Sequence, residues 1–111
     1  MRLDYEVIGN TLVVKLKGEL DHHVAEKIRA EMDDTINKNR CKNLIFNLSD
    51  MRFMDSSGIG VIIGRYKKIS QFGGKVAVVQ VSEKVDKIFN LAGLYRIINK
   101  YSTQNDALNS L

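Results

Sequence analysis

Two short apolar runs constrain the fold of this chain most strongly. They are KNLIFNL at 42–48 and KVAVVQV at 75–81, and each precedes a segment with helical periodicity. Runs of this length are typical of strands buried on both faces, which occur in parallel sheets covered by helices. A chain that alternates such strands with helices is expected to fold as an α/β protein.

The flanking segments extend this alternation to the order ββαβαβαβα. The stretches LDYEVIG and TLVVKLKG alternate apolar and polar residues around Gly9-Asn10, which predicts a β-hairpin. Helical patterns and their stop signals predict helices over 19–39, with Asp21 as N-cap, and over 56–74, 82–93 and 102–111. The stretch 95–101 predicts a short edge strand. We therefore expect one domain over 1–111, a mixed sheet of about five strands with about four helices.

Composition narrows the class of protein. A chain of 111 residues is long enough for one core without disulfides, and the single cysteine, Cys41, provides none. The net charge is +4, but the basic residues are scattered and aromatic residues are sparse, so we expect no nucleic-acid surface. No apolar signal region or membrane-length run is present, so we expect a cytoplasmic protein with no membrane partner.

Polar residues concentrate where predicted strands lead into helices. We expect three loops, at 18–23, 49–58 and 81–84, to meet at the carboxyl edge of the sheet, where α/β proteins place their sites. The clustered side chains would be those of Glu19, Asp21, Asp50, Asp55, Ser56 and Ser57. No other part of the sequence gathers functional groups in this way.

Three kinds of chemistry could use this cluster. His22 and His23 leave a serine hydrolase or a metal site formally open, but the G-x-S-x-G elbow is missing and further metal ligands are not evident. Gly58 and Gly60 open a helix after a strand, as in nucleotide sites. However, Ile63 occupies the place of the third glycine of the dinucleotide fingerprint, and the P-loop lysine is absent.

The glycines of this helix favour a contact surface. Gly58, Gly60 and Gly64 each cost up to about 1 kcal/mol of helix propensity relative to alanine. Three such costs in one helix indicate that it approaches the sheet or a partner closely.

A serine at a helix start could also act as a charge switch. Phosphorylation adds roughly −1.5 to −2 charges, here next to Glu19, Asp21 and Asp55. A partner that buries this serine would then meet an unpaired charge. The simpler alternative is that the two serines only cap the helix.

The chain also resembles a known family. The segments GELDHHVAEKI, NLIFNLSDMRFMDSSGIGVIIGRYKKI and LAGLYRIINK resemble the anti-sigma factor antagonists with the STAS fold, across nearly the whole chain. Within that family, FMDSSGIG followed by GRYK is similar to the sporulation branch. The resemblance implies a STAS domain over 1–111 and partner switching rather than catalysis.

In such switching, the unphosphorylated antagonist binds an anti-sigma factor serine kinase and frees a sigma factor. The kinase then phosphorylates the antagonist, and a separate serine phosphatase reverses this. The resemblance implies that Ser56 is the acceptor, that ATP is bound by the kinase and that this chain needs no cofactor. It implies a partner-binding site that consists of Glu19, Asp21, Asp55, Ser56, Ser57, Gly58 and Gly60. We expect a monomer when the protein is free, because no long apolar surface stripe remains.

Overall fold

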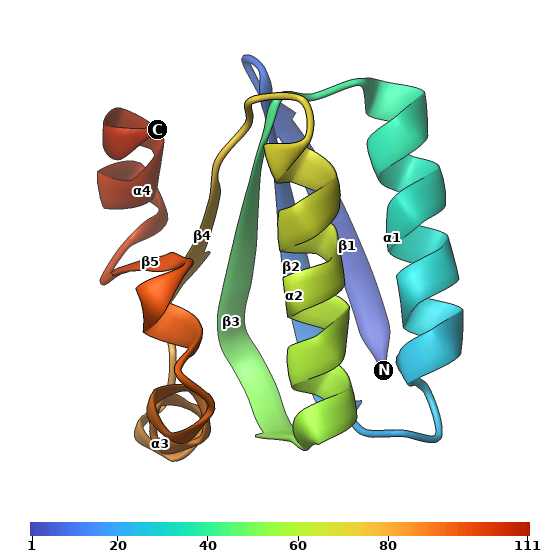
Figure 1. The fold of residues 1–111 in the computed structure, drawn as a ribbon, viewed down its shortest axis with the longest axis vertical. Helices are drawn as coiled ribbons and strands as arrows, with labels where there is room; N and C mark the ends of the chain where they lie inside the picture. Colours follow the sequence, from blue (N-terminus) through green and yellow to red (C-terminus); the bar gives the residue numbers. More distant parts are fainter.

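The two apolar runs lie in the central strands of a five-stranded mixed sheet (Figure 1). The computed structural model describes residues 1–111. Its strands are β1 (Arg2–Ile8), β2 (Thr11–Leu20), β3 (Asn43–Met54), β4 (Val76–Val79) and β5 (Asn99–Tyr101). Its α-helices are α1 (Ala25–Asn39), α2 (Ser56–Ser70), α3 (Glu83–Ala92) and α4 (Gln104–Ser110), and η1 (Leu94–Arg96) is a 3-10 turn.

The strands follow one another in the sheet in sequence order. β1 pairs with β2 in antiparallel fashion, and β2 through β5 are parallel. Gly9 has a φ of +60° in the two-residue turn between Ile8 and Thr11, a conformation that glycine adopts without steric cost. The predicted hairpin, the parallel crossovers and the element order are confirmed.

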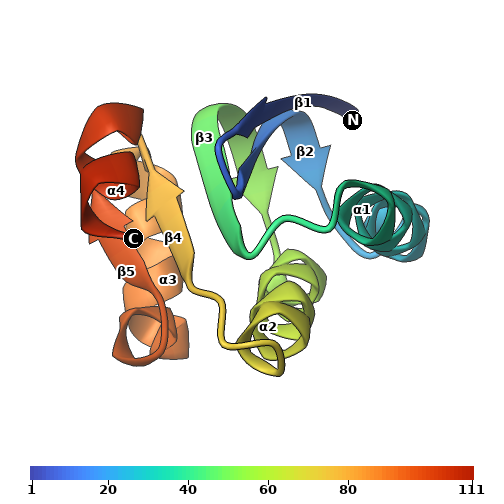
Figure 2. The ribbon, with the colours of Figure 1, turned by 90° about the horizontal axis from the view of Figure 1, so that it is seen from above.

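Alternate residues of the central strands face two separate cores. Leu12, Val14, Phe46 and Val78 pack with the buried faces of α1, α2 and α3 in the larger core. Val13, Ile45, Ala77 and Val79 point the other way and pack with Ala107 of α4. Figure 2 shows this arrangement, with α1 and α2 on one side of the sheet. Helices on both faces explain why these strands read as continuous apolar runs.

The predicted loop over 49–58 is wrong, because β3 continues to Met54. The strand remains paired with β2 up to Leu20 and Met54, with register shifts between Lys15 and Lys17 and between Gly18 and Glu19. Bulged pairing disturbs the regular alternation of buried and exposed residues, so the polar stretch looked like a loop. The same pairing places Gly18 and Glu19 in β2 rather than in a loop.

Several helix and strand boundaries also differ from the prediction. Asp21 is not the N-cap of α1, which begins at Ala25 after Val24 without a side-chain cap. A turn precedes the helix, in which the Asp21 carbonyl accepts hydrogen bonds from the amides of Val24 and Ala25. The edge strand is shorter than predicted, because residues 94–96 form η1 and pairing with β4 starts only at Asn99.

The helix signals at Ser82 and Gly93 are confirmed, whereas α2 ends at Ser70 rather than at 74 and α4 begins at Gln104 rather than at 102. Ser82 caps α3 by accepting a hydrogen bond from the Val85 amide at 3.3 Å, and Gly93 ends it with a φ of +71°. None of the four α-helices combines the length and the apolar character that a membrane crossing requires.

Candidate functional site

A single residue, Asp55, connects β3 to α2. Its backbone is extended, and its Oδ1 accepts hydrogen bonds from the amides of Ser57 at 2.9 Å and Gly58 at 3.3 Å. These are two of the amides that a helix start leaves without partners. Asp55 is therefore the N-cap of α2, and the interpretation of the serines as caps is wrong.

The second carboxylate oxygen of Asp55 reaches the neighbouring turn. The amide of His22 donates a hydrogen bond to Oδ2 at 3.2 Å, across 33 positions of sequence. The Asp55 amide in turn donates to the Leu20 carbonyl at 3.3 Å. One side chain thus ties the start of α2 to the turn between β2 and α1.

Asp21 organises that turn from within. Its Oδ1 accepts a hydrogen bond from the His23 amide at 2.9 Å, and the imidazole Nδ1 of His23 lies 3.6 Å from its Oδ2. Desolvation opposes ionisation of the Asp21 carboxyl, but the His23 amide and imidazole outweigh it and hold its pKa below the usual value. Asp21 and Asp55 are therefore anchored side by side through the consecutive residues His22 and His23.

The two serines differ in exposure. The first residue of α2, Ser56, is exposed, whereas Ser57 is half-buried. Neither hydroxyl oxygen makes a hydrogen bond within the chain, and the two imidazole rings lie near the carboxylates of Asp21 and Asp55. The Ser56 hydroxyl is consequently the one that is accessible to a large partner.

The glycines of α2 have different roles. A Cβ atom at Gly58 would lie 2.9 Å from the Leu20 carbonyl oxygen and would collide with the Met54 side chain. Gly58 is buried and lets α2 approach the sheet closely. A Cβ atom at Gly60 or Gly64 would meet nothing within 4 Å, so these two glycines leave open space on the helix surface.

Comparisons with known proteins agree with this architecture. Residues 2–107 match the family model described as the STAS domain. An anti-sigma F factor antagonist from Paenibacillus polymyxa is 40% identical over 111 residues, which cover 100% of this chain and 95% of the relative. Among solved structures, a Thermotoga maritima protein described as a candidate anti-sigma factor antagonist is 28% identical, with a TM-score of 0.91 over 97% of this chain and 92% of its own.

This chain is also similar to two solved forms of the Bacillus anti-sigma factor antagonist SpoIIAA. The unphosphorylated form is 29% identical with a TM-score of 0.75, over 98% of this chain and 96% of that one. The phosphorylated form is 31% identical with a TM-score of 0.74, over 98% of both chains. The chain belongs to the STAS-domain family of anti-sigma factor antagonists. These are regulatory proteins rather than enzymes, as the resemblance implied.

The antagonist brings together only part of the predicted acidic cluster. Asp21 and Asp55 meet through His22 and His23, and the exposed Glu19 lies at the end of β2, opposite Phe53. Asp50 does not belong to this group. It lies in the body of β3, opposite Lys17, and its carboxylate is 3.4 Å from the ammonium of Lys15.

Sequence reasoning missed one basic residue at this edge of the antagonist. The Lys84 ammonium, from the first turn of α3, lies 5.7 Å from the centre of the Phe53 ring, a distance typical of a cation–π contact. The sequence pointed to Lys84 only through the expected clustering of the loop at 81–84 with the loops at 18–23 and 49–58. No group of three or more His, Cys, Asp or Glu side chains is arranged to hold a metal ion.

Proposed function

We propose that this antagonist, when unphosphorylated, binds an anti-sigma factor serine kinase and so releases a sporulation sigma factor. Phosphorylation of Ser56 by the kinase ends this binding. The observation that carries the proposal is the exposed, unbonded Ser56 hydroxyl at the first residue of α2, beside the fixed carboxylate of Asp55. The name of the Paenibacillus relative and the two forms of SpoIIAA support it.

Exposure favours Ser56 over Ser57 as the acceptor. A kinase must place the acceptor hydroxyl in line with the γ-phosphate of its own ATP. Ser57 is half-buried, and its amide is already held by Asp55. Ser56 can be reached without loss of the cap that holds α2 in place.

The cap also determines what a phosphate would do at this position. A helix start normally attracts an anion through its free amides, but the amides of Ser57 and Gly58 are occupied by Asp55. A phosphate on Ser56 would add roughly −1.5 to −2 charges next to Asp55 and Asp21, with only weak compensation. Burying an unpaired charge in an interface costs about 3–5 kcal/mol, which weakens binding by at least about two orders of magnitude.

The proposed binding surface includes Glu19, Asp21, Asp55, Ser56, Ser57, Gly58 and Gly60. Gly58 is buried, so its role is to seat the start of α2 against the sheet. Gly60 follows Ser56 by one helical turn and leaves room for close approach of the kinase. We further propose that the free antagonist is a cytoplasmic monomer without a cofactor, and that a serine phosphatase restores its active form.

Phosphosite mapping tests the acceptor. Incubation with the cognate anti-sigma factor kinase and ATP should add one phosphate to the wild-type chain and to Ser57→Ala, and none to Ser56→Ala. Peptide mass spectrometry locates the phosphate. A phosphate on Ser57, or none on the wild-type chain, would refute the assignment.

Binding measurements test the charge mechanism separately. In calorimetric titration with the kinase, Ser56→Ala should bind like the wild-type chain, and Ser56→Asp should bind at least about 100-fold more weakly. The circular dichroism spectrum of Ser56→Asp should be unchanged, because the side chain points into solvent. Equal affinities of the three chains would rule out a switch by charge.

Nucleotide binding by this chain itself is the less favoured alternative. The amides of Ser57 and Gly58, which would hold a phosphate, are already bonded to Asp55. Equilibrium dialysis of the isolated antagonist against ATP and GTP should show no tight binding. Tight nucleotide binding at the start of α2 would favour a nucleotide-binding function over partner switching.

A further inference from the structure

A cavity of about 400 Å³ lies at the end of α1 and α2 that is remote from Ser56. Its walls come from the last turn of α1, the segment that leads into β3 and the last turn of α2. From Ser56 to Ile69 the helix rises about 20 Å, at about 1.5 Å per residue. The cavity is therefore separate from the proposed phosphorylation site.

The cavity combines an apolar lining with positive charge. Ile36 and Ile69 are buried at its base, and Phe72 is 78% exposed although it is a large aromatic residue. Volumes between about 300 and 1,000 Å³, lined by apolar groups and a few polar ones, are typical of small-molecule sites. Such a lining favours a ligand with an apolar body.

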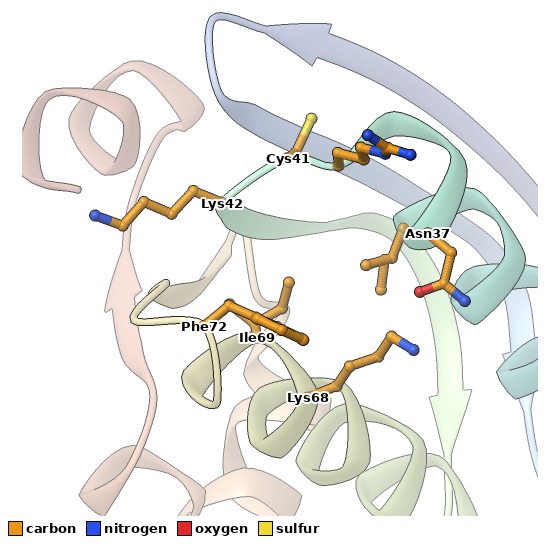
Figure 3. A pocket seen from close by; sticks show the side chains of 8 residues that line it. Asn37, Cys41, Lys42, Lys68, Ile69 and Phe72 are labelled. Atoms are coloured by element: carbon orange, nitrogen blue, oxygen red, sulfur yellow. The ribbon is translucent and has the colours of Figure 1, made fainter.

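The charged residues around the cavity are all basic. Arg40, Lys42 and Lys68 contribute to its walls, no acidic residue does, and none of the three forms an ion pair within the chain. Figure 3 shows the Lys68 side chain running from α2 toward Asn37 of α1, whereas the Lys42 ammonium extends away from the other side chains. Lys68 and Asn37 therefore offer donors for an anionic group.

We propose that this cavity binds a small amphipathic carboxylate. The apolar body contacts Ile36, Ile69 and Phe72, and the carboxylate pairs with the Lys68 ammonium and accepts a hydrogen bond from the Asn37 amide at the rim. The occupant covers the exposed ring of Phe72. This binding is independent of partner switching, since no residue of the cavity belongs to the start of α2.

Octanoate and 1-octanol, which share a chain length but differ in charge, form the test pair. Titration of the ¹⁵N-labelled protein should show octanoate binding at least about tenfold more tightly than 1-octanol, with amide shifts confined to residues 36–42 and 68–72. Equal binding of the two ligands, or shifts elsewhere in the chain, would overturn the proposal.

Two neighbouring lysines supply a matched control. Lys68→Gln should lose most of the preference for octanoate, whereas Lys67→Gln, an exposed position outside the cavity, should keep it. Asn37→Trp places bulk at the rim on an exposed helix position and should block binding. If Lys67→Gln reduces binding as much as Lys68→Gln does, the attraction is only that of general positive charge and the assigned site is wrong. All three variants should be phosphorylated like the wild-type chain, so failure here leaves the Ser56 proposal intact.

Discussion

Two glycines of the first turns of α2 should respond in opposite directions to the same substitution. In Gly58→Ala, the new Cβ lies 2.9 Å from the Leu20 carbonyl oxygen and closer still to the Met54 side chain. Overpacking of this kind costs about 1–3 kcal/mol. The backbone at Leu20 is fixed by pairing with Met54 of β3 and by the hydrogen bond from the Asp55 amide, so it cannot give way easily. The better helix propensity of alanine returns at most about 1 kcal/mol, so we expect a net loss of up to about 2 kcal/mol.

In Gly60→Ala, the added methyl group meets open space. Only the propensity term remains, and the free energy of unfolding should rise by about 0.5–1 kcal/mol. Urea unfolding followed by circular dichroism measures both variants, and unchanged m-values would show that the denatured states are comparable. Gly64→Ala, which is also unobstructed, serves as a second control. If Gly58→Ala proves as stable as Gly60→Ala, the close approach of α2 to the sheet does not constrain this position.

Three further perturbations concern polar side chains. Asp55→Ala should lower the free energy of unfolding by about 0.5–2 kcal/mol through loss of the cap, whereas Asp55→Asn should retain most of the capping stabilisation. Urea unfolding of the two variants measures the difference, and equal losses of stability would contradict capping. Arg65→Met should cost about 1–3 kcal/mol in the same assay. The Arg65 side chain is 7% exposed, and its Nε lies 2.9 Å from Oδ1 of Asp33. The Asp33 side chain is 31% exposed, which moderates the penalty for breaking a buried pair. If Asp33→Asn added to Arg65→Met restores none of this loss, pairing is not its cause. Hydrogen bonds from Tyr95 and Lys100 hold the pKa of Asp86 below its usual value. The resulting stabilisation is present above about pH 3.9 and is lost as the pH falls through the lowered folded-state pKa. The stability gap between wild type and Asp86→Asn should therefore be constant from pH 7 to 5 and close toward pH 2; a gap that does not change with pH would exclude this linkage.

The start of α2 could be predicted only in part from the sequence. The sequence pattern indicated a set of candidate site residues at a strand-to-helix junction, namely Asp55, Ser56 and Ser57. The division of roles among them was not accessible, because hydrogen bonding by Asp55 to the His22 amide joins residues 33 positions apart. Asp50 looked equivalent to Asp55 in the sequence, and only the pairing of β3 with β2 places it beside Lys15 and Lys17.

The sequence by itself determined the fold class, because continuous apolar runs can be satisfied only by strands that are covered on both faces. It also determined the element order and the helix ends at Ser82 and Gly93, which depend on local backbone chemistry. Tertiary structure decided how far β3 extends, where α1 begins and which glycine of α2 must remain a glycine. The extent of β3 and the constraint on Gly58 depend on the approach of β2, through bulged pairing and through Leu20. The start of α1 depends on the Asp21 turn, which is bound to Asp55 across 33 positions. No local pattern in α1, α2 or β3 encodes these contacts.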